Sequence, residues 1–143
     1  IDNEERPGEF KKHDYITGIN EVGAAPEEVE QELLELTGEI QNDYPLNNVI
    51  TVGAYFHLKF ENIHPFADGN GRTGRALLNY FLILNGHPPV CIYDEDKRQY
   101  MEALRIYDTN VDISPMEEFL KDQVEKTWQK TRSLTEIPLS MER

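Results

Sequence analysis

The segment from residue 72 to residue 85 constrains the fold of this chain more than any other. Between Ala76 and Leu84 it is almost entirely apolar, and Gly86 supplies a stop signal just after it. A helix of this composition keeps almost no polar face, which is typical of a helix that other helices surround. The sequence therefore predicts a helical fold with residues 72–85 at its centre.

Apolar residues recur at helical spacing in four other segments, so four more helices are predicted around this one. In the last of them, Ser114 is expected to be the N-cap and Glu117 to complete a capping box. The segment 94–107 is expected to begin at Asp94 or Asp96. The predicted ranges are 26–43, 47–63, 94–107 and 114–132.

The 143 residues suffice for one compact domain and are too few for two of ordinary size. We expect an irregular N-terminal segment over 1–23, a helical core over 24–132 and a tail over 133–143. The residues Tyr15, Ile16, Thr17 and Gly18 follow a pattern that favours a short hairpin. The predicted fold class is thus all-α, a helical bundle with a short β-hairpin flap near the N-terminus.

Acidic residues outnumber basic residues along the chain. Lys and Arg total 14 against 27 Asp and Glu, which gives a net charge of −13. Such a surface repels phosphates and anionic lipids, so we expect no nucleic acid and no membrane as partner. No apolar run reaches the roughly 18 to 20 residues of a membrane span. The one cysteine, Cys91, cannot form an internal disulfide, and a reducing, cytoplasmic location is expected.

The residues suited to chemistry gather in one stretch, from residue 64 to residue 75. A Gly69-Asn70-Gly71 turn precedes a predicted helix, where free backbone N–H groups meet the positive end of the helix dipole. Because glycine has no side chain, an anion can approach this backbone closely. The turn is therefore predicted to be a cradle of phosphate size, and Gly74 is counted among the phosphate-binding residues.

Charged side chains flank this turn on both sides. Arg72 and Arg75 are three residues apart on one helix face, where forked guanidinium groups can hold phosphate oxygens. Asp68 offers the hard oxygen ligand that Mg²⁺ favours when it also binds phosphates. His64, with an ordinary pKa of about 6.5, can take a proton from a hydroxyl at neutral pH. Phe66 is expected to anchor the loop in the core.

Together these groups make a site for transfer from a phosphate ester, in which positioning and charge neutralisation carry the catalysis. A hydrolase could use the same set of groups. The spacing differs from that of a P-loop, which places Lys and Ser or Thr directly after its glycines, so an ordinary NTPase is disfavoured.

The same stretch resembles the signature of the Fic family, H-x-F-x-[D/E]-G-N-G-R-x-x-R, and fills each specified position from His64 to Arg75. The similarity extends over roughly residues 7–128. It includes the helix before the signature, the Gly86-His87-Pro88-Pro89 exit and the C-terminal helices. The resemblance implies a Fic-type helical bundle.

The resemblance further implies a reaction. Fic proteins transfer AMP from ATP to a Tyr, Thr or Ser hydroxyl of a target protein, with pyrophosphate as the leaving group. Carried over to this chain, His64 is the catalytic base and Asp68 holds Mg²⁺. The Gly-Asn-Gly turn forms the anion hole, and Arg72 and Arg75 bind the phosphates.

The resemblance also implies partners. Fic proteins hold the target by main-chain pairing with a flap, a role that would fall to Tyr15, Ile16, Thr17 and Gly18. Many are silenced by a helix whose Glu pairs with the second arginine, here Arg75. No complete motif of this kind occurs in the chain. The inhibitory helix is therefore trimmed from this sequence, supplied by an antitoxin-like partner, or absent.

Several alternatives stay open. Relatives transfer UMP, GMP or phosphocholine, and the signature does not separate these donors. The death-on-curing toxins phosphorylate their targets, but they carry Lys where this chain has Gly71. A toxin-like module controlled by an antitoxin is another alternative. So is a nucleotide-binding regulator without transferase activity, against which the intact His64 speaks.

Two further residues have competing interpretations. Tyr100 could stack on a nucleotide base, but a lone helical Tyr packs more often in a core. His57 lies two helical turns before His64 and could form a metal pair with it. Ligand His pairs on helices more often sit four residues apart, so a hydrogen-bonded structural role is favoured for His57.

Overall fold

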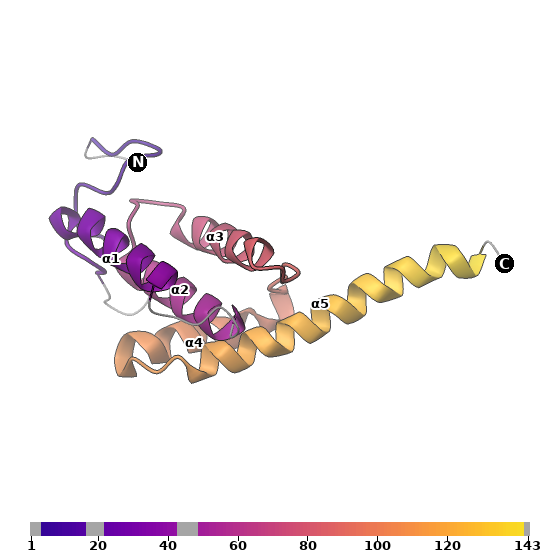
Figure 1. Cartoon of the computed structure of the whole chain (residues 1–143). Coiled ribbons are helices and arrows are strands. Elements are labelled where there is room, and N and C mark those ends of the chain that lie inside the picture. The colour runs from indigo at the N-terminus through magenta and orange to yellow at the C-terminus, as the bar shows by residue number, and fades with distance from the viewer. Residues whose placement is uncertain (1–3, 17–21, 43–48, 142–143) are drawn as a thin grey trace.

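The computed structural model describes residues 4–16, 22–42 and 49–141 (Figure 1). All regular structure over these residues is helical, which confirms the predicted fold class. Two short 3₁₀ turns, η1 (Pro26–Glu28) and η2 (Asp94–Asp96), lead into the first and fourth α-helices. The α-helices of the described residues are α1 (Val29–Asn42), α2 (Val49–Ile63), α3 (Asn70–Leu84), α4 (Lys97–Asn110) and α5 (Ser114–Met141).

Helix α2, rather than α3, lies at the centre of the bundle. It packs against α1, α3, α4 and α5, whereas the backbone of α3 comes close only to that of α2 among the described helices. The outer face of α3 is exposed at Tyr80 (62%), Ile83 (56%) and Leu84 (64%). The prediction that residues 72–85 form the centre is therefore wrong. Composition shows how apolar a helix is, but not which of its sides other helices cover.

Small residues allow α2 to take this central place. Val52 and Ala54 are at most 1% exposed, and Gly53 stands between them. A Cβ added to Gly53 would lie 3.2 Å from Cδ1 of Leu78 on α3. Because Gly53 has no side chain, α2 and α3 can approach each other closely. These two helices flank the loop that begins at His64.

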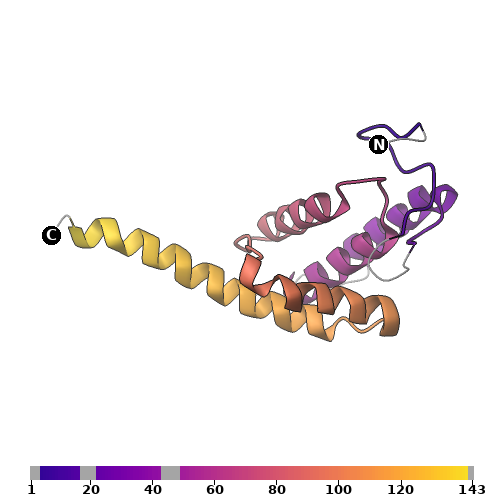
Figure 2. The same ribbon diagram turned by 180° about the vertical axis from the view of Figure 1, so that it is seen from behind.

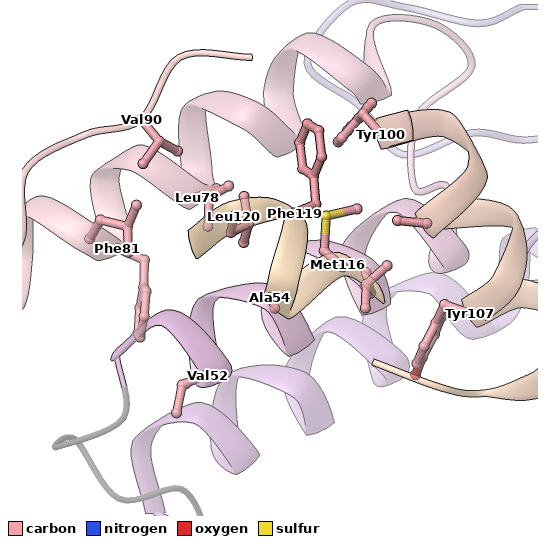
Figure 3. Packing of buried hydrophobic residues seen from close by; sticks show 13 residues of the cluster. Val52, Ala54, Leu78, Phe81, Val90, Tyr100, Tyr107, Met116, Phe119 and Leu120 are labelled. Carbon is pink, nitrogen blue, oxygen red and sulfur yellow. The ribbon is translucent and has the colours of Figure 1, made fainter. Parts of the chain in front are cut away.

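The main hydrophobic core lies where α2, α3, α4 and α5 meet (Figure 3). Met116, Phe119 and Leu120 of α5 fill its middle, each at most 1% exposed. Burying a side chain of this kind stabilises the fold by roughly 1.5–3 kcal/mol. A second cluster fixes α1 against α2, and its buried members are Val29, Leu36, Phe60 and Ile63.

Two helix boundaries differ from the predicted ones. Helix α3 begins at Asn70, two residues before the expected start. Helix α5 continues to Met141, so most of the predicted tail is a helix that extends away from the others (Figures 1 and 2). Extending a formed helix costs little, so the helix can continue past its predicted end at residue 132. None of the described helices combines the length and apolarity needed to cross a membrane.

The start of α5 also differs from the predicted capping box. The N–H of Ser114 donates to Oδ1 of Asp112 (3.0 Å), and Ser114 is already the first helical residue. The side chain of Glu117 contacts Lys121 instead of reaching back to the helix start (3.3 Å). The N-cap position is therefore Ile113, whose carbonyl accepts from the N–H of Glu117 (3.0 Å), and the predicted Ser114 cap is wrong.

The described part of the N-terminal segment contains no strand. Tyr15 and Ile16, the first half of the predicted hairpin, lie in irregular chain. Thr17 and Gly18, its turn, fall outside the described residues. The β-hairpin flap therefore stays a prediction.

Candidate active site

His64 follows the last residue of α2 and has a left-handed backbone conformation. Its N–H still donates to the carbonyl of Phe60 (3.1 Å), while its φ is +53°. Residues other than glycine rarely adopt this conformation, which costs roughly 1–3 kcal/mol and persists only where the surroundings enforce it. The turn ends α2 and sets the imidazole in the wall of a pocket of about 880 Å³.

Gly23 of the N-terminal segment helps to hold His64 in this left-handed conformation. A Cβ added to Gly23, whose φ is +78°, would lie 2.8 Å from both Cβ of His64 and the carbonyl oxygen of Ile63. The N–H of Ala24 donates to the same Ile63 carbonyl (3.0 Å). Only glycine fits here, so the segment is tightly attached to the end of α2 beside the imidazole.

Lys11 attaches the same segment on the other side of the loop. It is 2% exposed; its N–H donates to the carbonyl of Pro65 (2.9 Å), and its ammonium group donates to that of Val22 (3.2 Å). Burial, and to a smaller extent the charge of Lys11, lower the pKa of His64. A lower pKa keeps the imidazole neutral at pH 7, as a general base requires.

The side chain of Asn70 fixes the loop between α2 and α3. Its Oδ1 accepts from the N–H of Phe66 (2.9 Å), and its Nδ2 donates to the carbonyl of Phe66 (2.8 Å). The same Nδ2 lies 3.2 Å from Nε2 of His64. Because an amide nitrogen only donates, Nε2 is the acceptor, and the neutral imidazole carries its proton on Nδ1.

The backbone after this loop has the geometry of the predicted anion cradle. Gly69 is the N-cap of α3 with φ +82°, and its N–H donates to Oδ1 of Asp68 (2.8 Å). The first N–H groups of a helix have no acceptor within the helix. Those that follow Gly69 therefore stand at the positive end of the α3 dipole.

Both signature arginines reach back over the glycines of this cradle. Nη2 of Arg72 lies 3.6 Å from the position of a Cβ on Gly69. Nη1 of Arg75 lies 3.1 Å from that of a Cβ on Gly71. Two cations at a helix N-terminus repel its dipole, and a bound anion would remove this penalty.

The loop and α4 enclose a pocket of about 880 Å³. Arg72 lines an adjacent hollow of about 650 Å³, and Asp68 and Gly69 line both. Of the predicted site residues, those that line the larger pocket are Tyr15, Ile16, His64, Asp68, Gly69, Asn70 and Gly71.

The far wall of this pocket comes from α4 and was missed by the sequence analysis. It includes Met101, Leu104, Arg105 and Asp108. Met101 is 50% exposed, although it lies on a helix whose other apolar residues are largely covered. An apolar residue on the polar side of an amphipathic helix was the one signal for this wall in the sequence.

Gly74 does not line the cradle, although it was predicted to bind phosphate. It is buried in α3 against α2, where a Cβ would overlap Oε1 of Glu61. Among the described residues, that buried oxygen has no hydrogen-bond partner. Burial raises the pKa of Glu61 to about 7, although the Arg75 charge opposes the rise. Gly74 therefore makes room for a carboxyl group of the pocket wall.

Tyr100 lies in the core and presents no surface to a nucleotide base. It is 3% exposed, and its hydroxyl lies 2.6 Å from Nε2 of His57. His57 is 1% exposed, and its Nδ1 lies 3.2 Å from the carbonyl oxygen of Gly74. The structural role favoured for His57 is confirmed.

Phe66 and Asp68 both line the smaller hollow, but they differ in exposure. Phe66 is half-buried and packs against Phe10, with 5.8 Å between ring centroids, and against the second hydrophobic cluster. This position fits the predicted anchor. Asp68 is exposed at the pocket. The residues that the structure describes contain no group of three or more His, Cys, Asp or Glu suited to hold a metal ion.

Comparison with known proteins identifies relatives of this chain. The model of the Fic/DOC family matches residues 1–82. Protein adenylyltransferase Fic of Drosophila mojavensis is 36% identical over 124 residues, which are 84% of this chain and 24% of that protein. The protein of the same name from Culex quinquefasciatus is 39% identical over 82 residues, which are 57% of this chain and 16% of that protein. The chain thus spans a quarter or less of their length.

Solved structures have the same fold. A Fic-domain signaling protein from Bacteroides thetaiotaomicron has a TM-score of 0.72 at 25% identity, covering 88% of this chain and 54% of that one. Fic-1 from C. elegans has a TM-score of 0.71 at 27% identity, covering 88% of this chain and 38% of that one. The architecture of this chain is therefore that of Fic-domain proteins.

Proposed function

The chain belongs to the Fic/DOC family, and on that premise we propose that it is a protein adenylyltransferase. It transfers AMP from ATP to a Tyr, Thr or Ser hydroxyl of a target protein and releases pyrophosphate. The observation that carries the proposal is the contact of Asn70 with Nε2 of His64 (3.2 Å), which places a neutral imidazole beside the N-terminus of α3. The names of the Drosophila and Culex relatives support the same reaction.

In this proposal the phosphates of ATP bind at the N-terminus of α3. The N–H groups after Gly69 and the guanidinium groups of Arg72 and Arg75 bind phosphate oxygens and stabilise the charge that develops during transfer. Asp68 fits a Mg²⁺ ion that also takes phosphate and water oxygens, since one exposed carboxylate suffices for such a site. Bound there, the ion would neutralise phosphate charge and assist departure of pyrophosphate.

His64 removes the proton of the target hydroxyl at Nε2. The target oxygen forms a bond to the α-phosphorus, and the bond from that phosphorus to the bridging oxygen of the β-phosphate breaks. Pyrophosphate leaves with the electron pair of this bond, and the imidazolium then releases its proton to solvent. Before the step, the Asn70 amide occupies Nε2, and the target hydroxyl replaces it as hydrogen-bond partner.

The two remaining walls of the pocket receive the nucleoside and the target. Met101 and Leu104 of α4 offer apolar surface to the base, and Arg105 and Asp108 offer polar groups. At the opposite rim, Ile16 is 74% exposed and would meet the target segment. Main-chain pairing with a flap, an inhibitory helix or antitoxin partner, and a cytoplasmic location all stay predictions.

Intact-mass analysis tests the proposal. The protein and a cell lysate are incubated with Mg²⁺ and each of ATP, GTP, UTP and CTP in turn. We expect an increment of one AMP with ATP, lost in His64→Ala and retained in His87→Ala, which alters a histidine outside the pocket lining. Full labelling in His64→Ala would refute the assigned base. Tight ATP binding without any modified protein would favour a nucleotide-binding regulator.

A further inference from the structure

A hydrogen bond between Asn62 of α2 and Asp108 of α4 fixes one carboxylate in the pocket wall. Nδ2 of Asn62 donates to Oδ1 of Asp108 (2.9 Å). Asp108 lines the pocket together with His64, whereas Asn62 stands outside the lining. Asn62 precedes His64 by two residues, or about 3 Å along the helix axis. The hydrogen bond therefore holds the carboxylate of Asp108 near the proposed base.

The carboxylate of Asp108 can accept more hydrogen bonds than the one from Asn62. An ionised carboxylate has about four lone pairs and donates no proton. Arg105 lies three residues earlier on the same helix face, but its guanidinium group pairs with Glu102 through bonds of 2.6 and 2.9 Å. Within the described part of the chain, no ion pair involves Asp108. Its remaining lone pairs are therefore available to hydrogen-bond donors of a ligand in the pocket.

The position of Asp108 indicates which part of a nucleotide it meets. In the proposed reaction the α-phosphorus lies next to His64, and the other phosphates extend over the arginines of α3. The ribose is joined to the α-phosphorus through one oxygen and one methylene group, so it lies near His64 on the side away from these arginines. Asp108 lines the pocket on α4, the wall opposite the cradle. The carboxylate therefore faces the sugar.

The apolar part of the same wall lies farther along α4. Leu104 and Met101 also line the pocket, four and seven residues before Asp108. They are about 6 and 10 Å from it along the helix axis. A base that follows the ribose meets these two side chains. The order of groups on α4 thus matches the order of sugar and base in a nucleoside.

We propose that Asp108, held by Asn62, accepts hydrogen bonds from the 2′- and 3′-hydroxyls of the nucleotide and makes the pocket selective for ribonucleotides. The ribose offers two neighbouring hydroxyl donors, and an acidic side chain binds such a hydroxyl in dinucleotide-binding folds. This inference rests on the proposed function in taking a nucleoside polyphosphate as the ligand, and it names the sugar that the site selects.

Titrations that change both the protein and the ligand test the proposal. ADP and 2′,3′-dideoxy-ADP are titrated against the full chain, and the ratio of their Kd values is compared between the wild type and Asp108→Ala. We expect the wild type to bind ADP about tenfold more tightly, because hydrogen bonds to a charged group are lost in the analogue. In Asp108→Ala this ratio should fall below about twofold.

The matched control is Asp96→Ala. The carboxylate of Asp96 also accepts from a side-chain amide, that of Gln123 (3.2 Å), but Asp96 lies outside the pocket lining. This variant should keep the tenfold ratio of the wild type. Loss of the ratio in both variants would overturn the proposal, because it would show that Asp108 has no specific effect on the sugar.

A merely structural role of Asp108 gives a different result. A disturbed pocket weakens both nucleotides equally and leaves the ratio unchanged, which would overturn the proposal. So would a wild type that binds both nucleotides alike or does not bind ADP at millimolar concentration. Pyrophosphate has no sugar, so its affinity should not fall in Asp108→Ala, and a fall as large as that of ADP contradicts sugar recognition. If Asp108→Ala fails to fold, Asp108→Asn answers the same question, with a ratio of about threefold.

The outcomes separate this inference from the proposed function. A ratio that depends on Asp108, in a wild type that modifies no protein, supports sugar recognition and refutes the adenylyltransferase. A wild type that modifies targets, with a ratio near one, refutes only sugar recognition.

Discussion

The side-chain amide of Asn70 connects the loop to the imidazole of His64, since its Nδ2 donates to the Phe66 carbonyl (2.8 Å) and lies 3.2 Å from Nε2 of His64. The sequence predicts Asn70 as part of the anion hole. Its side chain instead fixes the loop and selects the tautomer of the base, so only its N–H is available to an anion.

Replacing Asn70 by Ala removes these hydrogen bonds. We expect AMP transfer to fall about a hundredfold, because the imidazole of His64 is no longer held in the orientation that transfer requires. The matched control is Asn79→Ala. Asn79 makes the same pair of backbone bonds, with Val90 (2.9 and 3.1 Å), far along α3 from the cradle. Both variants lose about 1–3 kcal/mol of unfolding free energy. Urea unfolding measures the stability of both variants, and AMP transfer is measured separately. Equal transfer activity in the two variants would contradict the role assigned to Asn70.

Lys11 affects the pH dependence of transfer through His64. The lowered pKa of His64 places the acid limb of kcat/KM below the ordinary imidazole value of about 6.5. In Lys11→Met a cation is lost, the pKa of His64 rises, and the limb moves to higher pH. Lys12→Met, which alters the neighbouring exposed lysine, should leave it in place. A limb that moves equally in both variants would show that Lys11 has no specific effect.

Gly74 tolerates no side chain, because a Cβ there overlaps the carboxylate of Glu61. We expect Gly74→Ala to lose about 1–3 kcal/mol of stability, as overpacked cores do. Adding Glu61→Ala should recover part of this loss. Gly38→Ala is the control, since nothing lies within 4 Å of a Cβ there, and it should gain up to about 1 kcal/mol. Thermal and urea unfolding measure the stability of both variants. If Gly74→Ala were as stable as the wild type, the overlap with Glu61 would be disproved.

His57 makes the fold sensitive to acid. Its pKa is about 4 in the folded protein and about 6.5 when unfolded, so the unfolded state binds the proton first as pH falls. The stability it contributes is complete above pH 6.5 and is lost between pH 6.5 and 4, by about 3 kcal/mol. Urea unfolding across this range should show a shallower pH dependence in His57→Gln. Parallel curves would exclude a buried, neutral His57.

Glu61 has the opposite dependence, because its pKa is raised from 4.5 to about 7. The folded state keeps the proton longer, so stability is highest below pH 4.5 and falls as pH rises to about 7. Glu61→Gln should therefore be about 3 kcal/mol more stable than the wild type at pH 8 and similar to it at pH 4. Glu30→Gln, at an exposed site of α1, is the control. An unchanged or lower stability at pH 8 would contradict the burial of an unpartnered carboxyl.

The helices and the signature could be predicted because they depend on local pattern. The spacing of apolar residues predicts ranges close to those observed for α2 and α4, and the glycines predict the turn before α3. The centre of the bundle could not be predicted in this way. Tyr80, Ile83 and Leu84 are as apolar as buried residues, and only the three-dimensional packing shows that nothing among the described residues covers them.

The site was predicted only where sequence neighbours are also spatial neighbours. His64, Asp68 and Gly71 share one wall because one loop carries them. Met101 lines the same pocket from a distant segment, and Lys11 contacts the loop at Pro65 from another. No sequence motif predicts such contacts. Gly74 was misassigned because a glycine that admits a neighbouring side chain and one that admits a ligand look alike in a sequence.

The tight contact of Gly23 with His64 links the movement of the N-terminal segment to that of the base. One carbonyl, that of Ile63, ties the strip of chain beside the pocket rim to the residue before the base. If the proposed target docks on this segment, a displacement of the segment would also displace His64, so target binding and proton removal would be mechanically coupled.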